Sequence, residues 1–284
     1  MKPAQLNKLE ERGFTLIELL TALAIFLIIT GAAFTLLTSS QKRYQTESQV
    51  LTSFQEARLG LDQMVRDIND AGFPPPTYKY PVSGTKFNYL TSAPFAWSLG
   101  AGYPTTPCAI NTCPTSTAGD YAPGDFDIII ETNPNYNPSD PASQVQWIRY
   151  QLQGTTLMRG LANKVSVDDP DADTAANMVP FVQNVVNNSP SLVIGTSALS
   201  ASYPTMFSGG AVPIFQYFCD HPAVPQFPIP PTAWCTSAGS DDSPANIRDV
   251  IITLIVAAPL PDATTGKPRL VQLEGRGRRL NPNQ

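Results

Sequence analysis

The chain has 284 residues, enough for one large domain or two modest ones with a substantial core. Its formal net charge of −5 argues against generic binding to nucleic acid. Only 14% of the residues are charged and 28 are prolines, while an apolar content of 42% excludes disorder over most of the chain. This composition is typical of a loop-rich extracytoplasmic protein rather than a cytosolic enzyme.

The first elements are a short polar leader, residues 1–13, and an apolar run. From Phe14 to Leu37 the only ionisable side chain is Glu18. A helix of about 24 residues is about 36 Å long, which exceeds the ~30 Å hydrocarbon core of a bilayer. Because an acid at the centre of such a helix costs about 2.5–3.5 kcal/mol, Glu18 is a candidate functional residue.

The helical pattern continues beyond the apolar run as an amphipathic segment. Apolar residues recur in steps of three and four, with polar residues on the other side. Gly72 suits the C′ position, and the prolines that follow cannot continue a helix. The sequence therefore predicts one helix over 14–72, whose second half packs on the remaining chain. The apolar stripe comprises Val50, Leu51, Phe54, Ala57, Leu61, Met64, Val65 and Ile68, and the polar side Gln55, Glu56, Asp62, Arg66 and Asp67.

Residues 73–284 change to short β-like runs separated by proline, glycine and asparagine. Gln153–Gly154, between two of these runs, predicts a hairpin turn. We expect an α+β fold, in which an antiparallel sheet packs on the amphipathic half of the helix and long loops occupy 79–120 and 219–246. The basic C-terminal segment from Gly275 is expected to fray. The predicted strands are 125–131, 145–153, 155–159, 179–186, 212–218, 249–257 and 269–273.

Four cysteines form two local pairs in the sequence, Cys108 with Cys113 and Cys219 with Cys235. An even count behind a membrane-directing segment indicates disulfides formed in an oxidising compartment. Three connectivities are possible, and local pairing is favoured; the second loop would then stabilise the fold by about 3 kcal/mol in the chain-entropy model. A four-thiolate zinc site is the alternative, although the spacings differ from the usual C-x2-C.

The segment "RGFTLIELL" resembles the N-terminal signature of type IV prepilins and type II secretion pseudopilins. In that signature a short leader ends in glycine, phenylalanine follows, and the fifth residue after the cut is glutamate; here these are Gly13, Phe14 and Glu18. The resemblance implies that a membrane-embedded prepilin peptidase cleaves between Gly13 and Phe14 and N-methylates Phe14. It also implies that Glu18 docks subunits by pairing with the terminal amine of a neighbour, which satisfies both charges only at the correct axial stagger.

Later landmarks, in their order and spacing, are similar to those of PilW-type minor pilins and the related J-type pseudopilins. The resemblance implies a leader at 1–13, a helix at 14–72 whose first part, 14–37, is the transmembrane and filament-core segment, and an extracytoplasmic pilin domain at 73–284. The implied partners are other major and minor pilins, the prepilin peptidase and the inner-membrane assembly platform. These landmarks are "MVRDINDAGF", "TTLMRG", "VPFVQNVV", "IFQYF" and "IRDVIITLIVA".

The function implied by this likeness is initiation or assembly of a type IV pilus by a minor pilin. Such a protein is a single-pass inner-membrane protein with a periplasmic domain, and later part of a filament at the cell surface. A J-type pseudopilin of type II secretion is one alternative. A tip adhesin mounted on a pilin helix is another, which exposed aromatic side chains such as Trp97 or Trp234 would favour.

Several of these residues also admit plainer interpretations. A secretory signal peptide over 1–37 leaves Glu18 unexplained. The acidic run 168–173 invites a calcium site, but an EF-type loop needs later residues that are missing, which favours a solvated acidic loop. His221, the only histidine, follows Cys219 by two residues. A catalytic pair of the two is not expected, because a cysteine in a disulfide cannot act as a nucleophile. No nucleotide, hydrolase or metal motif occurs in the sequence, so we expect no enzymatic activity, no cofactor and no small-molecule substrate.

Overall fold

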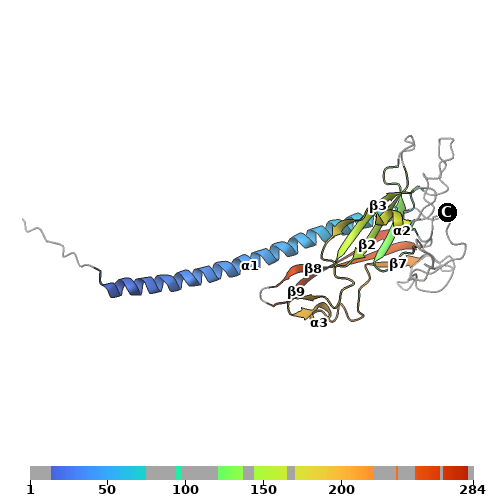
Figure 1. Cartoon of the computed structure of the whole chain (residues 1–284). Helices are drawn as coiled ribbons and strands as arrows, with labels where there is room; N and C mark the ends of the chain where they lie inside the picture. Colours follow the sequence, from blue (N-terminus) through green and yellow to red (C-terminus); the bar gives the residue numbers. More distant parts are fainter. Residues whose placement is uncertain are drawn as a thin grey trace, which may run out of the picture. The chain divides into compact units, whose positions relative to one another are not determined.

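The computed structural model comprises two compact units, Met1–Glu47 and Ser48–Gln284. Helix α1 (Leu16–Asn69) passes through the boundary between them, so its first half lies in one unit and its second half in the other. Figure 1 shows this helix in blue and the strands of the second unit in green to red. The residues that the structure describes are 14–74, 94–96, 121–136, 144–164, 170–219, 235, 247–262 and 265–280.

Helix α1 confirms the long helix predicted from the sequence. It has 54 residues, which correspond to about 80 Å of α-helix. The helix ends at Asn69, and Gly72 follows after a further turn, with φ of 81°, rather than at the C′ position. The Gly72 N–H donates to the backbone oxygen of Glu131 (2.8 Å), so this glycine also fixes the end of the helix to a strand.

Two antiparallel sheets fill most of the described second unit and confirm the predicted α+β architecture. The first sheet has the strand order β1-β2-β3-β4, and the second has the order β7-β8-β9. The pair β5-β6 and the short helices α2 and α3, none of which the sequence predicts, complete the unit. The bounds are β1 Asp127–Thr132, β2 Gln146–Gln153, β3 Thr156–Asn163, α2 Pro170–Ala175, β4 Val179–Val182, β5 Val193–Ile194, β6 Ser197–Ala198, α3 Leu199–Ser202, β7 Phe215–Cys219, β8 Ile247–Pro261 and β9 Pro268–Arg278.

The hairpin predicted at Gln153–Gly154 joins β2 to β3. Their ladder continues to the pair Gln153↔Thr156, and Gly154 has φ of 59°, in the left-handed region that glycine adopts without steric cost. A two-residue loop with glycine at its first position therefore sets the register of the first sheet. In Figure 1, β2 and β3 run side by side as this pairing requires.

The main core lies between the second half of α1 and both sheets. Ala57, Leu61, Met64 and Ile68 are buried, which confirms the C-terminal part of the predicted stripe. At the start of the stripe Val50 and Phe54 are half-buried, but the prediction for Leu51 is wrong, since Leu51 is 61% exposed. The sheet residues in this core include Ile128, Ile130, Ile148, Tyr150, Val250, Ile252 and Leu254.

The prediction that Asp67 lies on the exposed side of α1 is also wrong. Its side chain is buried, and it accepts hydrogen bonds from Tyr150 Oη (2.5 Å), Arg159 Nη2 (3.0 Å) and Gln63 Nε2 (2.7 Å). A buried carboxylate is tolerated when a cation and hydrogen-bond donors satisfy it. Because Tyr150 and Arg159 come from β2 and β3, far away in the sequence, the local helical pattern could not predict them.

The C-terminal segment does not fray as predicted. Strand β9 continues to Arg278 and pairs with β8 up to Asp249↔Arg278. A Cβ built on Gly277 would lie 2.5 Å from Ile68 Cγ2, so only a residue without a side chain lets the strand approach α1 this closely. The glycines of "GRGR" therefore face the helix, and the alternating arginines point to the opposite side of the sheet.

Candidate functional site

The candidate site is the N-terminal part of α1, where Glu18 lies in the first helical turn. Thr15 precedes the helix, and its N–H and hydroxyl both donate to Glu18 Oε2, each at 2.9 Å. The Glu18 N–H in turn donates to Thr15 Oγ1 (3.3 Å). This reciprocal arrangement is a capping box, in which Thr15 is the N-cap residue and Glu18 the third residue of the helix.

The two oxygens of the Glu18 carboxylate are used differently. Both bonds from Thr15 end on Oε2, and Oε1 has no hydrogen-bond partner in the described part of the chain. One oxygen is thus held in place by the chain itself, while the other is available to a donor from another molecule. A positioned, half-satisfied carboxylate is suited to binding an ammonium group.

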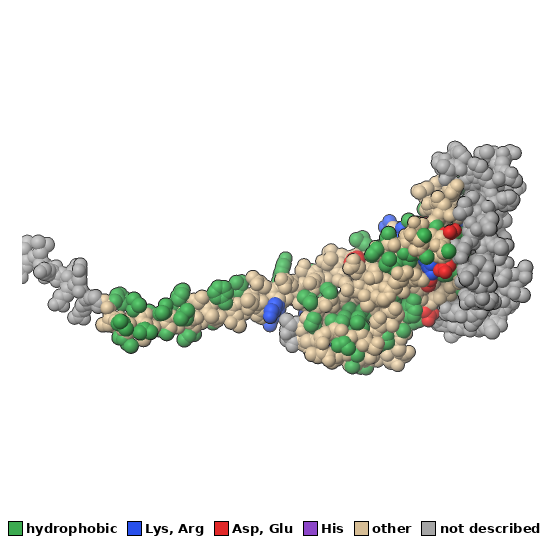
Figure 2. Space-filling view, in the orientation of Figure 1, with side chains coloured by type: hydrophobic (Ala, Val, Ile, Leu, Met, Phe, Trp, Pro, Cys, Tyr) green, Lys and Arg blue, Asp and Glu red, His purple; other side chains and the backbone are tan. Residues whose placement is uncertain are grey.

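The side chains around Glu18 form an apolar surface on all sides of the helix. In Figure 2, green hydrophobic side chains follow the first half of α1. Threonines in this stretch turn their hydroxyls to the backbone: Thr21 donates to Ile17 O (3.0 Å) and Thr35 to Gly31 O (2.8 Å). Side chains more than half exposed here are Phe14, Leu16, Ile17, Leu19, Leu20, Leu23, Ile25, Phe26, Leu27, Ile28, Ile29, Phe34, Leu36 and Leu37.

Helix α1 is long and apolar enough to cross a membrane. None of its most apolar window is buried inside the protein. An apolar surface of this length has to be covered by lipid or by other proteins, since soluble monomers rarely leave such a patch in water. The segment therefore fits membrane anchoring, with Glu18 near one end of the apolar stretch.

The predicted processing site is only partly described. Phe14 is 84% exposed immediately before the helix, whereas Gly13 lies outside the described residues. The capping box was not predicted, although its signal is in the sequence: Thr15-Leu16-Ile17-Glu18 has the threonine-x-x-glutamate pattern that precedes an apolar helix.

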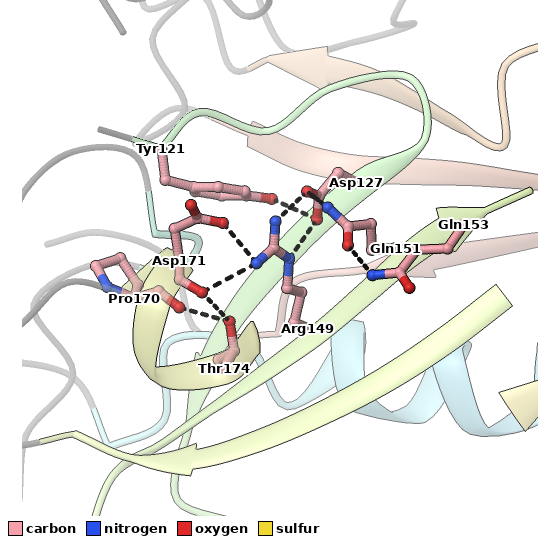
Figure 3. A network of polar contacts seen from close by, with 8 residues as sticks. All are labelled: Tyr121, Asp127, Arg149, Gln151, Gln153, Pro170, Asp171 and Thr174. Carbon is pink, nitrogen blue, oxygen red and sulfur yellow. Dashed lines mark hydrogen bonds and ion pairs between the residues drawn. The ribbon is translucent and has the colours of Figure 1, made fainter. Parts of the chain in front are cut away.

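A second cluster of polar groups surrounds Arg149 in the first sheet (Figure 3). Arg149 donates through Nε to Asp127 Oδ1 (3.0 Å) and through Nη2 to Asp127 Oδ2 (2.6 Å). Its Nη1 contacts Asp171 of α2, at Oδ1 (2.5 Å) and at the backbone oxygen (3.1 Å). The guanidinium also lies over the ring of Tyr121, with 5.6 Å to the ring centroid.

This cluster has the properties of a structural network. Burial raises the pKa of Asp127, against the opposing effect of the hydrogen bonds and charge of Arg149. Burial likewise raises the pKa of the Tyr121 hydroxyl, which therefore stays neutral. Arg149 is bonded to the carboxylates of Asp127 and Asp171, so it holds α2 against β1 and β2.

The acidic run 168–173 differs from the solvated loop that the sequence favours. Residues 170–173 belong to α2, and Asp171 is paired with the buried Arg149; the start of the run lies outside the described residues. Among the residues that the structure describes, no group of three or more His, Cys, Asp or Glu side chains is placed to hold a metal ion. The commitment of Asp171 to Arg149 also argues against calcium at this position.

Cys219 and Cys235 form a disulfide, in agreement with local pairing (S–S 2.11 Å, Cα–Cα 5.2 Å). The Cys235 N–H also donates to the backbone oxygen of Tyr217 (3.1 Å), so the bond fastens this position beside β7. A zinc site made of all four thiolates is incompatible with this bond. Cys108 and Cys113 lie outside the described residues.

Comparison with protein families agrees with this description of the N-terminal segment. Residues 9–34 match the model of the prokaryotic N-terminal methylation motif. The match supports the assignment of the chain to the type IV pilin-like superfamily, implies processing by a prepilin peptidase and assembly with other pilins, and points to a structural protein. No curated protein and no solved structure matches the chain.

Proposed function

We propose that this protein is a minor pilin of the PilW type, which takes part in the initiation or assembly of a type IV pilus. The observation that carries the proposal is the first half of α1, an exposed apolar helix with Glu18 as its only ionisable side chain before Lys42. The family motif at 9–34 supports the same class of protein. A prepilin peptidase cleaves between Gly13 and Phe14 and methylates the new amine of Phe14.

In this proposal the helix has two successive environments. It first anchors the protein in the inner membrane with the globular domain in the periplasm, and then packs against the helices of neighbouring pilins in the filament. Both environments remove the apolar side chains from water, at about 25 cal/mol per Å² of buried apolar surface. The apolar contacts tolerate many axial positions, whereas a charge pair tolerates few.

Glu18 supplies the axial selectivity. A carboxylate and an ammonium that are each unfavourable in an apolar medium become tolerable together, whereas an unpaired one is penalised by several kcal/mol. The free Oε1 of Glu18 accepts the terminal amine of a neighbouring subunit, while Thr15 fixes Oε2. Docking is therefore favoured at the stagger that brings the two charges together.

The first test is the N-terminus of the mature protein, determined by sequencing or mass spectrometry of the membrane-purified chain. We expect it to begin at N-methylated Phe14. A chain that retains its leader, or one that begins after residue 30 as a secretory signal peptide would predict, contradicts the assignment.

The second test separates the charge of Glu18 from its capping role. Glu18→Gln keeps the capping-box geometry, which glutamine also supports, and removes the charge. The matched variant Thr15→Val removes the cap and keeps the charge. We expect both to be inserted and cleaved, and Glu18→Gln alone to lose co-purification with partner pilins. Loss in Thr15→Val with retention in Glu18→Gln would mean that the acid only caps the helix.

Two neighbouring functions share the same helix. A J-type pseudopilin would dock in the same way but in a type II secretion system, so deletion of the gene distinguishes the two by loss of surface pili or loss of secretion. A tip adhesin would retain the helix as a mount. The aromatic residues that would favour it, Trp97 and Trp234, lie outside the described residues.

A further inference from the structure

Strand β9 has an outer edge that pairs with no other strand in the described part of the chain. The N–H of Arg279 donates to Arg248 O at the start of β8 (2.9 Å), so in this antiparallel ladder odd-numbered residues face β8. On the other strand, Ile255, the partner of Gln272, donates its N–H to Asn187 Oδ1 instead, which agrees with this alternation. The residues whose backbone N–H and C=O point away from β8 are therefore Leu270, Gln272, Glu274 and Arg276.

Both ends of this outer edge are closed by the chain itself. Tyr203 Oη donates to Pro268 O at the beginning of β9. At the other end Asn69 Oδ1 accepts from the Arg278 N–H (2.8 Å). Between them, the eight backbone groups of the four outward residues make no hydrogen bond with any residue that the structure describes.

Within the described residues, the outer edges of β1 and β7 make backbone hydrogen bonds to other segments of the chain. The edge of β1 is covered by 94–96, through Ala96 N to Ile129 O (2.9 Å) and Glu131 N to Pro94 O (3.0 Å). Beside β7, Cys235 donates to Tyr217 O.

The remaining edge strand of the first sheet, β4, is protected in a different way. It has only four residues, contains Pro180, and its pairing with β3 has a register shift. β9, with 11 residues, is thus the long edge left open in the described structure.

We propose that the outer edge of β9 binds an extended acidic segment of another polypeptide, which adds to the sheet as a further strand. The main-chain groups provide the hydrogen bonds, as in other cases of strand addition. Selectivity for acidic residues comes from arginines on an otherwise acidic protein. Arg276 and Arg278 lie on one face at the end of β9, and the side chain of Arg276 is 58% exposed although it shares Asp249 with Arg248. Glu274 is the one acidic residue among the four outward positions, so the arginines outnumber it at this end of the strand. Arg269, whose side chain is 49% exposed and paired with Asp262, lies on the other face near the opposite end.

The closed ends limit the length of the bound segment. From residue 270 to residue 276 an antiparallel strand rises about 20 Å, at about 3.4 Å per residue. This is the length of a typical single strand in a globular protein. The surface lies on β9 rather than on α1, so the inference does not depend on the docking role of Glu18.

The test uses the full-length protein in detergent and the peptide acetyl-Val-Glu-Val-Glu-Val-Glu-Val-amide as the probe. Hydrogen–deuterium exchange is followed at single-residue level in β9. In the free protein we expect the outward amides of 270, 272, 274 and 276 to exchange freely and the inward amide of 273 to be protected. At saturating peptide the outward amides slow by about tenfold or more, whereas the same peptide with lysine for glutamate has little effect.

Two variants test strand addition itself. Gln272→Pro removes an outward N–H that makes no hydrogen bond with the described residues, so we expect the fold to be kept and the peptide affinity to fall by about tenfold. The control Gln272→Thr keeps the N–H and should keep the affinity. If Gln272→Pro disturbs the fold, which the amide of 273 reports, a peptide with alternate N-methylated amides replaces it and should not bind.

Four results would overturn the proposal. In the exchange experiment, the first is that the outward amides are already protected without peptide, the second is that the lysine peptide protects them equally, and the third is that their protection grows with protein concentration alone. The fourth is that binding is unchanged in Gln272→Pro or with the N-methylated peptide. The first would show that the chain covers its own edge. The third would identify a second copy of this chain as the occupant.

Discussion

Each half of α1 carries an acidic side chain, and the two differ in exposure and in bonding partners. Glu18, in the first half, is exposed and makes hydrogen bonds only to Thr15 in its own first turn. Asp67, in the second half, is buried and bonded to Tyr150 and Arg159 of the sheet. The chain thus supplies both a cation and hydrogen-bond donors to Asp67. To Glu18 it supplies hydrogen bonds at one carboxylate oxygen only.

This difference indicates that the second half of the helix stabilises the fold, whereas the first half makes contacts with other molecules. Where the chain supplies a cation, the carboxylate fixes the helix to the sheet and serves the fold. Where an apolar surface surrounds the acid and the chain supplies no cation among its described residues, the partner is expected from another molecule. The contrast can be tested because variants in one half should change stability and those in the other half assembly.

The largest expected effect is that of Arg159→Leu. This variant leaves Asp67 buried beside a hydroxyl and an amide without a cation, which costs about 3–5 kcal/mol in the free energy of unfolding. Urea denaturation of the full-length protein in detergent measures it. The control Arg58→Leu replaces an exposed arginine of α1, the helix that carries Asp67, and should change stability by less than about 0.5 kcal/mol.

The double variant Asp67→Leu with Arg159→Leu sharpens this prediction. If the loss in Arg159→Leu arises from an uncompensated charge, removal of the acid should restore much of the stability, because a buried ion pair is often replaceable by apolar residues. A double variant that is less stable than Arg159→Leu would show instead that the packing of the arginine, rather than its charge, is what the fold requires.

The two glycines of α1 give a second, smaller test of the contrast. A Cβ at Gly60 would overlap Val182 Cγ2 on β4, whereas a Cβ at Gly31 would have no atom within 4 Å. We expect Gly60→Ala to lower stability by about 1–3 kcal/mol through overpacking, despite the better helix propensity of alanine. Gly31→Ala should leave the unfolding of the second unit unchanged. Equal effects of the two variants would contradict the assignment of the first half to contacts outside the chain.

Much of the fold could be predicted because its signals are local. The absence of proline from Phe14 to Phe73, the stripe around Met64 and the turn at Gly154 each depend on neighbouring residues, and each has its counterpart in the structure. The processing motif is local as well, which is why residues 9–34 suffice for a family match.

Two of the predictions that were wrong concern partners far away in the sequence. Asp67 is buried because Arg159 lies beside it, at a separation of 92 residues. The GRGR segment forms a strand because its glycines fit against Ile68 of the helix, and a charge count alone indicates only a solvated tail. In both cases the local sequence is polar and indicates exposure to solvent. The residues are nevertheless packed inside the fold, because a distant element contacts them.

The smallest expected effect is that of Thr15→Val on the start of α1. Loss of the hydroxyl removes one of the two donors to Glu18 Oε2 and the acceptor for the Glu18 N–H, while the backbone N–H of residue 15 remains as a donor. Such caps contribute about 0.5–2 kcal/mol to a helix end. Amide exchange in the first turn, at residues 17–19, should therefore accelerate, while urea denaturation of the second unit stays the same. Thr21→Val, whose hydroxyl only donates to backbone oxygens within the helix, is the matched control and should leave the first turn unchanged. If Thr15→Val instead destabilises the second unit, the two halves of the helix are energetically coupled, and the separation between an inward-acting and an outward-acting half no longer holds.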